Sequence, residues 1–150
     1  MAEAETFMEE GRADVMLIAY SWPDENWAPQ ECTGERDYDY SVECFRPEPL
    51  TTQGEAISLR DYASEQGWDS VAVMTVDHHV TRSRMIINRC FDGELHMIGV
   101  EAEGYWGGPV RTYLYQNAGI ARTLLSSGCE GEPPDWIQDS GDSLKDRLLE

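Results

Sequence analysis

The side chains of this 150-residue chain best suited to acid–base or metal chemistry are three histidines and a neighbouring aspartate. Asp77, His78 and His79 are consecutive, and His96 lies in a later apolar segment. Because histidine changes its charge near neutral pH, His79 and His96 with Asp77 would suit a small hydrolase or ligand-binding domain. The sequence shows no set of four ligands with the spacing of a structural zinc site, so it predicts neither a metal nor a cofactor.

The four cysteines are also candidates for chemistry: Cys32, Cys44, Cys90 and Cys129. No two of them are close enough in the sequence for the paired spacing of a zinc site. No basic start followed by an apolar stretch indicates a signal peptide, so we expect a cytoplasmic protein with reduced thiols. In this interpretation Cys44 and Cys90 are small core residues in strands, and Cys32 and Cys129 lie in loops.

The chain is strongly acidic, with a formal net charge of −18 from 29 acidic and 11 basic residues. This sign of charge disfavours direct binding to nucleic-acid phosphates. The acidity has three competing interpretations: a solvated surface, as in a salt-rich cell, a face that docks on a basic protein, and carboxylates that bind a metal. No apolar run is long enough to span a membrane.

Two rows of acidic residues near aromatic residues predict a surface that binds a partner protein. The first row would lie on the wet face of a strand, and the second along one side of a helix. The first comprises Asp37, Asp39 and Glu43, and the second Asp135, Asp139, Asp142 and Asp146. Trp22, Trp27 and Trp136 would anchor the partner, while the charge steers its approach.

The function favoured by these features is that of a small acidic inhibitor. It would dock on the basic surface of a nucleic-acid-binding protein or complex and imitate the phosphate backbone. Inhibitors encoded by phages and mobile elements, such as anti-CRISPR and anti-restriction proteins, are similar in size and charge. Two alternatives stay open: a small hydrolase or ligand-binding domain that uses His79, His96 and Asp77, and a structural subunit of a larger assembly. The oligomeric state is also open.

The pattern of apolar residues predicts a single α+β domain over residues 1–150, with the element order ββαβββαα. Strands are expected at 13–21, 37–44, 68–77, 85–91 and 94–101, and the main helices at 52–66 and 109–125. Residues 1–12 are expected to form one or two helical turns or a loose segment. Residues 130–150 are expected to form a short amphipathic, acidic helix.

Short signals in the sequence set the expected boundaries and the pairing of the strands. Residues 52–55 match a capping box, in which Thr52 and Glu55 would satisfy each other's backbone amides, and Gly67 would end that helix. Asp92-Gly93 is a hairpin signal. Because short turns join neighbouring strands, we expect a mostly antiparallel sheet of about five strands, with the two main helices on one face.

Overall fold

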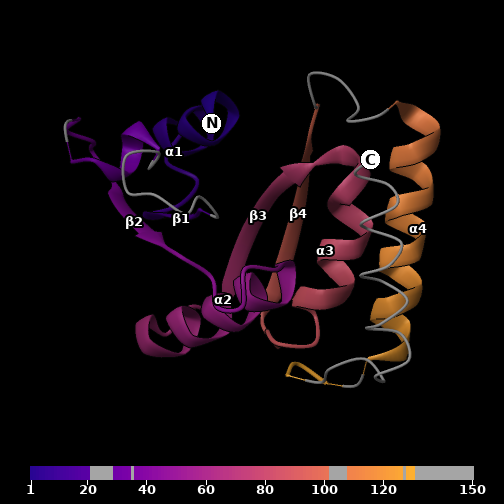
Figure 1. Cartoon of the computed structure of the whole chain (residues 1–150). Helices are drawn as coiled ribbons and strands as arrows, with labels where there is room; N and C mark the ends of the chain where they lie inside the picture. Colours follow the sequence, from indigo (N-terminus) through magenta and orange to yellow (C-terminus); the bar gives the residue numbers. More distant parts are fainter. Residues whose placement is uncertain (21–28, 35, 102–107, 127, 131–150) are drawn as a thin grey trace.

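The computed structural model describes residues 1–20, 29–34, 36–101, 108–126 and 128–130. Within these ranges the fold is α+β, with four α-helices and two small sheets (Figure 1). The elements are α1 (Ala2–Glu9), β1 (Val15–Ala19), β2 (Ser41–Phe45), α2 (Thr52–Gln66), β3 (Ser70–Val76), α3 (Val80–Ile87), β4 (Glu94–Val100) and α4 (Pro109–Leu125). None of these helices is both long and apolar enough to cross a membrane.

The expected five-stranded antiparallel sheet is wrong. The four strands form two separate pairs, and both pairs are parallel: β1 with β2, and β3 with β4. Ser70 is opposite Glu94 at the start of the second pair, and Val76 is opposite Val100 at its end. A parallel pair needs a crossover connection, so the short turns expected between neighbouring strands cannot join β3 to β4.

Residues 85–91 explain the error, because they form no strand. The apolar run Met85-Ile86-Ile87 belongs to α3, which carries the chain from β3 to β4. Asp92-Gly93 forms no hairpin either, since neither residue has a positive φ. Instead, the Glu94 amide donates a hydrogen bond of 2.8 Å to the Asp69 carbonyl, which sets the two strands in register.

The start of α2 differs from the expected capping box by one residue. Thr51 is the N-cap, and its hydroxyl accepts a hydrogen bond from the Gly54 amide at 3.2 Å. The prediction that Thr52 and Glu55 form the capping box is therefore wrong, because Thr51 is the N-cap. The predicted end of the helix is confirmed, because Gly67 adopts a left-handed conformation with φ of 70° and its amide bonds the Ala63 carbonyl.

Two hydrophobic clusters hold these elements together. The larger one packs α2 and the end of α3 against β3 and β4, around the buried residues Ala56, Ala63, Ile87, Cys90 and Phe91. The smaller one joins α1 to β1 and β2, around Met8, Met16 and Ile18. Figure 1 shows α3 lying along β3 and β4, with α4 on the outer side of α3.

All four cysteines are paired, so the expectation of reduced thiols is wrong. Cys32 is bonded to Cys44 and links the segment before β2 to β2 itself. Cys90 is bonded to Cys129 and links the turn after α3 to the segment after α4. Sequence spacing could not reveal these pairs, because the chain brings together cysteines that are 12 and 39 residues apart.

A methyl group at Gly54 is expected to destabilise the fold. A Cβ atom there would collide with the backbone carbonyl of Pro49, which cannot move without shifting the chain before α2. We expect Gly54→Ala to lower the free energy of unfolding by about 1–3 kcal/mol, the usual cost of overpacking, as measured by urea denaturation. Ser64→Ala on the exposed side of the same helix is the control. Equal stability of the two variants would contradict the close approach of Gly54 to the Pro49 carbonyl.

Candidate functional site

A chain of hydrogen bonds around His79 is the feature best suited to chemistry. The Thr52 hydroxyl lies 3.2 Å from Nε2 of His79, and the Gln116 side-chain oxygen lies 3.2 Å from Nδ1. An amide oxygen only accepts hydrogen bonds, so Nδ1 carries the proton in the neutral ring. Nε2 is then the acceptor for the Thr52 hydroxyl. Two hydrogen bonds thus connect a hydroxyl to a base, and the base to a group that orients it.

Three separate elements bring these side chains together. His79 ends the short 3-10 turn η3 (Asp77–His79), which directly follows β3. Thr52 is the first residue of α2, and it is available because Thr51 provides the cap. Gln116 comes from the middle of α4. The site therefore lies beyond the carboxyl end of a parallel strand, where sheets with helical crossovers commonly bind ligands.

Arg82 brings a positive charge to this cluster and lies where α3 meets α4. Its guanidinium carbon is 5.7 Å from the centre of the Tyr115 ring. The helices approach closely because position 119 is glycine: a Cβ atom there would be 2.5 Å from Nη1 of Arg82. The same arginine interacts electrostatically with both Glu55 and His79. Arg82 is thus the cation shared by the two titratable groups of the site.

Burial moves the pKa values of His79 and Glu55 toward each other. Desolvation lowers the pKa of His79, the electrostatic effects of Arg82 and His78 lower it further, and the hydrogen bond to Gln116 partly opposes them. Desolvation raises the pKa of Glu55, against the opposing effect of Arg82. Both groups therefore favour their neutral forms, so His79 is suited to accept a proton and Glu55 to donate one.

These shifts predict opposite contributions to the dependence of stability on pH. The pKa of folded His79 lies below its unfolded value, so its contribution to stability is present at neutral pH and is lost as pH falls below about 6.5. The pKa of folded Glu55 lies above its unfolded value, so its contribution is present in acid and is lost as pH rises above about 4.5. Glu55→Gln should therefore be more stable than the wild type at pH 8, and this advantage should shrink at pH 5.

Urea denaturation at both pH values, with the disulfides intact, measures this change. Glu65→Gln is the matched control, since Glu65 is exposed on the same helix. An advantage of Glu55→Gln that is equal at pH 5 and pH 8 would show that Glu55 is not desolvated in the folded chain.

Glu55 is also one of the residues that line a large cavity, which the other residues of the His79 cluster do not line. The cavity has a volume of about 1240 Å³ and is lined by all of β1, by most of β3, by parts of α1, α3 and β4, and by Glu55 and Leu59 of α2. Most of the lining residues are apolar, including Met16, Ile18, Val71 and Val73. The volume exceeds the usual range for sites that bind small molecules. Glu55 therefore joins the electrostatic cluster around His79 to an apolar space large enough for an organic ligand.

The structure separates His79 from one of the two residues that the sequence grouped with it. Asp77 lies in the same turn, and a Cβ atom at Gly99 would collide with its carboxylate, so Asp77 lies against β4. His96 is opposite Ala72, several residues before the end of β3, and its Nε2 lies 3.4 Å from the Glu94 carboxylate. At about 3.3 Å per residue along a strand, this register puts the two histidines more than about 10 Å apart.

Only three of the ten residues expected to bind a partner lie among the described residues. Asp37 and Asp39 are exposed, but they precede β2, which begins at Ser41, so they do not share a strand face with Glu43. Glu43 lies within β2 and is half-buried. The other seven lie outside the described residues: Trp22, Trp27, Asp135, Trp136, Asp139, Asp142 and Asp146.

Sequence reasoning singled out His79 but missed its partners. Thr52 and Glu55 are three residues apart, as are His79 and Arg82, and this spacing places helical side chains on one side. Two such pairs, each with a titratable residue, could have indicated the site from the sequence. No comparable pattern in the sequence indicates Gln116.

In the described part of the chain, no three His, Cys, Asp or Glu side chains are gathered to hold a metal ion. Comparison with protein-family models, curated proteins and solved structures gives no significant match.

Proposed function

We propose that this protein is a hydrolase that cleaves esters at the Thr52–His79–Gln116 site. The observation that carries the proposal is the line of two hydrogen bonds, each 3.2 Å, that joins a hydroxyl, an imidazole and an amide. Nucleophile, base and orienting group occur in this relation in enzymes of unrelated folds, so the argument depends on geometry and not on ancestry. This is the hydrolase alternative built on His79, with Thr52, Glu55 and Gln116 in place of His96 and Asp77.

The proposed reaction has two steps. In the first, Oγ1 of Thr52 forms a bond to the carbonyl carbon of the ester and gives its proton to Nε2 of His79. The bond to the leaving oxygen breaks, and that oxygen takes the proton of the Glu55 carboxyl group. In the second, water attacks the acyl group and gives its proton to Glu55, while Oγ1 of Thr52 leaves and recovers its proton from His79.

Positive charge near the reacting atoms would stabilise the oxyanion formed in each step. Thr52 is in the first turn of α2, where backbone amides and the helix dipole favour negative charge. Arg82 adds a full positive charge close enough to influence both His79 and Glu55. Such stabilisation of charge that develops in the transition state is usually a large part of enzymatic rate enhancement.

The cavity beside Glu55 indicates esters with a sizeable apolar group. A chain held against β1 and β3 would place its ester near Glu55, which lines the same cavity. The test compares hydrolysis of p-nitrophenyl octanoate, p-nitrophenyl acetate and p-nitrophenyl phosphate by the oxidised protein. We expect turnover of the octanoate to be fastest. The absence of turnover for all three would refute ester hydrolysis, and preference for the phosphate would refute the acyl class.

Docking on a basic protein surface is a second candidate, favoured by the exposure of Asp37 and Asp39 in a chain of net charge −18. We expect Asp37→Lys/Asp39→Lys to weaken capture of basic nucleic-acid-binding proteins from a lysate several-fold at low salt, because charge steers association. Quantitative mass spectrometry of the captured proteins at two salt concentrations measures this change. Glu65→Lys, a charge reversal at another exposed position, is the control. Equal capture by both variants would reject a specific role for the two aspartates.

A further inference from the structure

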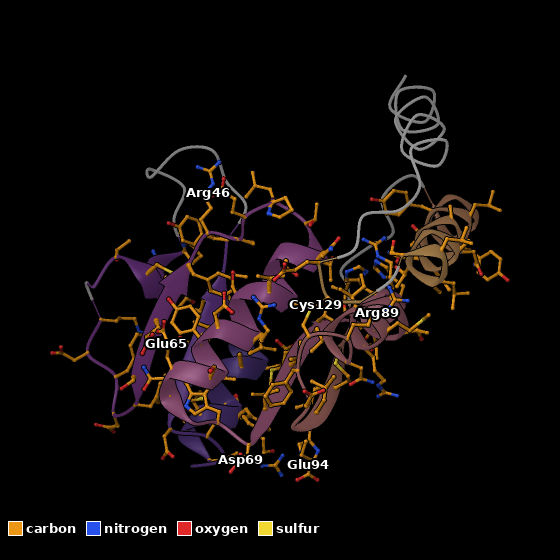
Figure 2. All side chains as sticks on the ribbon, turned by 90° about the horizontal axis from the view of Figure 1, so that it is seen from below. Arg46, Glu65, Asp69, Arg89, Glu94 and Cys129 are labelled. Atoms are coloured by element: carbon orange, nitrogen blue, oxygen red, sulfur yellow. A yellow bond between two sulfur atoms is a disulfide. The ribbon has the colours of Figure 1, made fainter. Side chains whose placement is uncertain are left out.

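The short segment after α4 is fastened to two other parts of the fold. Cys129 forms a disulfide with Cys90 in the turn after α3, with the Cα atoms 4.7 Å apart. The Cys129 carbonyl also accepts a hydrogen bond of 2.9 Å from the side-chain amide of Gln53 in α2. We call residues 128–130 the strap. Figure 2 shows Cys129 and Arg89 close together in the view from below, as the disulfide to the next residue requires.

A second contact joins the strap to α2. Arg60 donates a hydrogen bond of 2.9 Å to the Glu130 carboxylate, and its guanidinium is 3.6 Å from the sulfur of Cys129. Since Arg60 and Glu130 are partly exposed, this ion pair contributes little by itself. The disulfide is therefore the strongest attachment of the strap. The hydrogen bonds from Gln53 and Arg60 fix the orientation of the strap against α2.

The strap connects the two helices that complete the His79 site. Gln53, which bonds the strap, directly follows Thr52, whose hydroxyl contacts His79. On the other side, the strap follows α4, which supplies Gln116. A displacement of the strap would thus be transmitted to both hydrogen bonds of the imidazole.

Among the described residues, few side chains of α4 are buried against the rest of the fold. Among the α4 side chains that the structure describes, Thr123 alone is buried. Large apolar side chains point outward instead: Tyr113 is 68% exposed, Leu114 62% and Leu124 65%. Since burial of apolar surface is the main force that docks a helix, α4 depends on its attachments more than most helices do.

We propose that the Cys90–Cys129 disulfide is a redox switch of the His79 site, which is complete when the bond is formed and incomplete when it is reduced. A dithiol reductant breaks the sulfur–sulfur bond and is itself oxidised to a disulfide. Each cysteine sulfur gains one electron and one proton. The freed strap lets α4 leave α3, so that Gln116 no longer orients His79 and Arg82 loses the cover of α4. The role of this site in ester hydrolysis rests on the function proposed above.

The test compares two disulfide-deficient forms of the full chain by NMR. In Cys90→Ser/Cys129→Ser, amide hydrogens of α4 should exchange roughly 5- to 150-fold faster, the usual range of coupling between linked sites. The pKa of His79, followed by its ring proton, should rise toward its ordinary value as water reaches the ring. Cys32→Ser/Cys44→Ser, whose strap is intact, should leave both properties of the wild type unchanged. Unchanged exchange and pKa in the first variant would overturn the proposal.

A second variant keeps the test decisive if Cys90→Ser/Cys129→Ser does not fold. Gln53→Ala/Arg60→Ala keeps the disulfide and removes the polar contacts of the strap, so exchange in α4 should increase by a smaller factor. No increase would count against the switch. These measurements need no substrate, and they separate the two proposals. A response of His79 to the strap in a protein that hydrolyses no ester would support the switch and reject the hydrolase.

Discussion

Loss of both disulfides is expected to lower the free energy of unfolding by about 7 kcal/mol. In the chain-entropy estimate, a link over 12 residues contributes about 3 kcal/mol and a link over 39 residues about 4 kcal/mol. The total stability of a domain is about 5–15 kcal/mol, so the reduced chain should be only marginally folded or unfolded. Urea denaturation with and without a reductant measures the difference.

The two links can be separated because their expected effects differ. Cys90→Ser/Cys129→Ser should cost about 1 kcal/mol more than Cys32→Ser/Cys44→Ser, since its loop is longer. Alkylation of the unfolded, unreduced protein checks the premise, because four paired cysteines leave no reactive thiol. Alkylation of all four thiols in protein purified without reductant would contradict the pairing itself.

Replacement of His79 by glutamine is expected to lower kcat for p-nitrophenyl octanoate by roughly 100- to 10,000-fold, the usual contribution of general acid–base catalysis. Glutamine retains a polar side chain but cannot accept the proton of the Thr52 hydroxyl. Thr52→Val should have a similar effect, since it removes the attacking oxygen, whereas Thr52→Ser should retain measurable turnover. Initial rates of p-nitrophenol release measure all three variants.

The dependence of the rate on pH identifies the residues more specifically than the rate alone. A lowered pKa of His79 should keep the wild type active somewhat below pH 6.5, and the raised pKa of Glu55 should limit activity at higher pH. Glu55→Gln should therefore lose the decline at higher pH. Glu65→Gln is the matched control, because Glu65 is exposed on α2 and does not line the cavity, so this variant should behave as the wild type. A large loss of turnover in Glu65→Gln, with none in His79→Gln, would contradict the proposed site.

Local signals in the sequence predicted most elements but not their arrangement. The strand at β1, the end of α2 at Gly67 and the helix that starts at Pro109 are all confirmed, although only Met16 and Ile18 of β1 are buried. Each depends on residues close together in the sequence, where propensity and capping act directly. The run at residues 85–87 was misjudged because a short apolar stretch fits a strand or a buried helix equally well. Its packing against α2 and β4, which only the fold reveals, decides between them.

The same limit applies to the site. His79 could be singled out because histidine is rare in this chain and titrates near neutral pH. The choice of His96 as its partner failed because it assumed a hairpin, whereas the parallel register puts His96 opposite Ala72. Gln116 was unpredictable, since glutamine has no chemistry of its own and acquires a role only through contact with His79.

The paired cysteines also remove the basis for expecting a cytoplasmic protein. That expectation depended on thiols kept reduced, and disulfides persist mainly in oxidising compartments. The structure pairs all four cysteines, so an oxidising environment is the one in which this fold is most stable.

The position of the Cys90–Cys129 bond has a consequence for the synthesis of the protein. A ribosome makes Thr52, Glu55 and His79 well before it makes Gln116 and Cys129. A nascent chain that has just completed β4 can already form the crossover from β3 to β4, because domains fold progressively as they emerge. His79 would then lack its hydrogen bond to the side-chain amide of Gln116. In the proposed function, the docking of α4 would complete the site, and ester hydrolysis would begin only once the chain has emerged past Cys129.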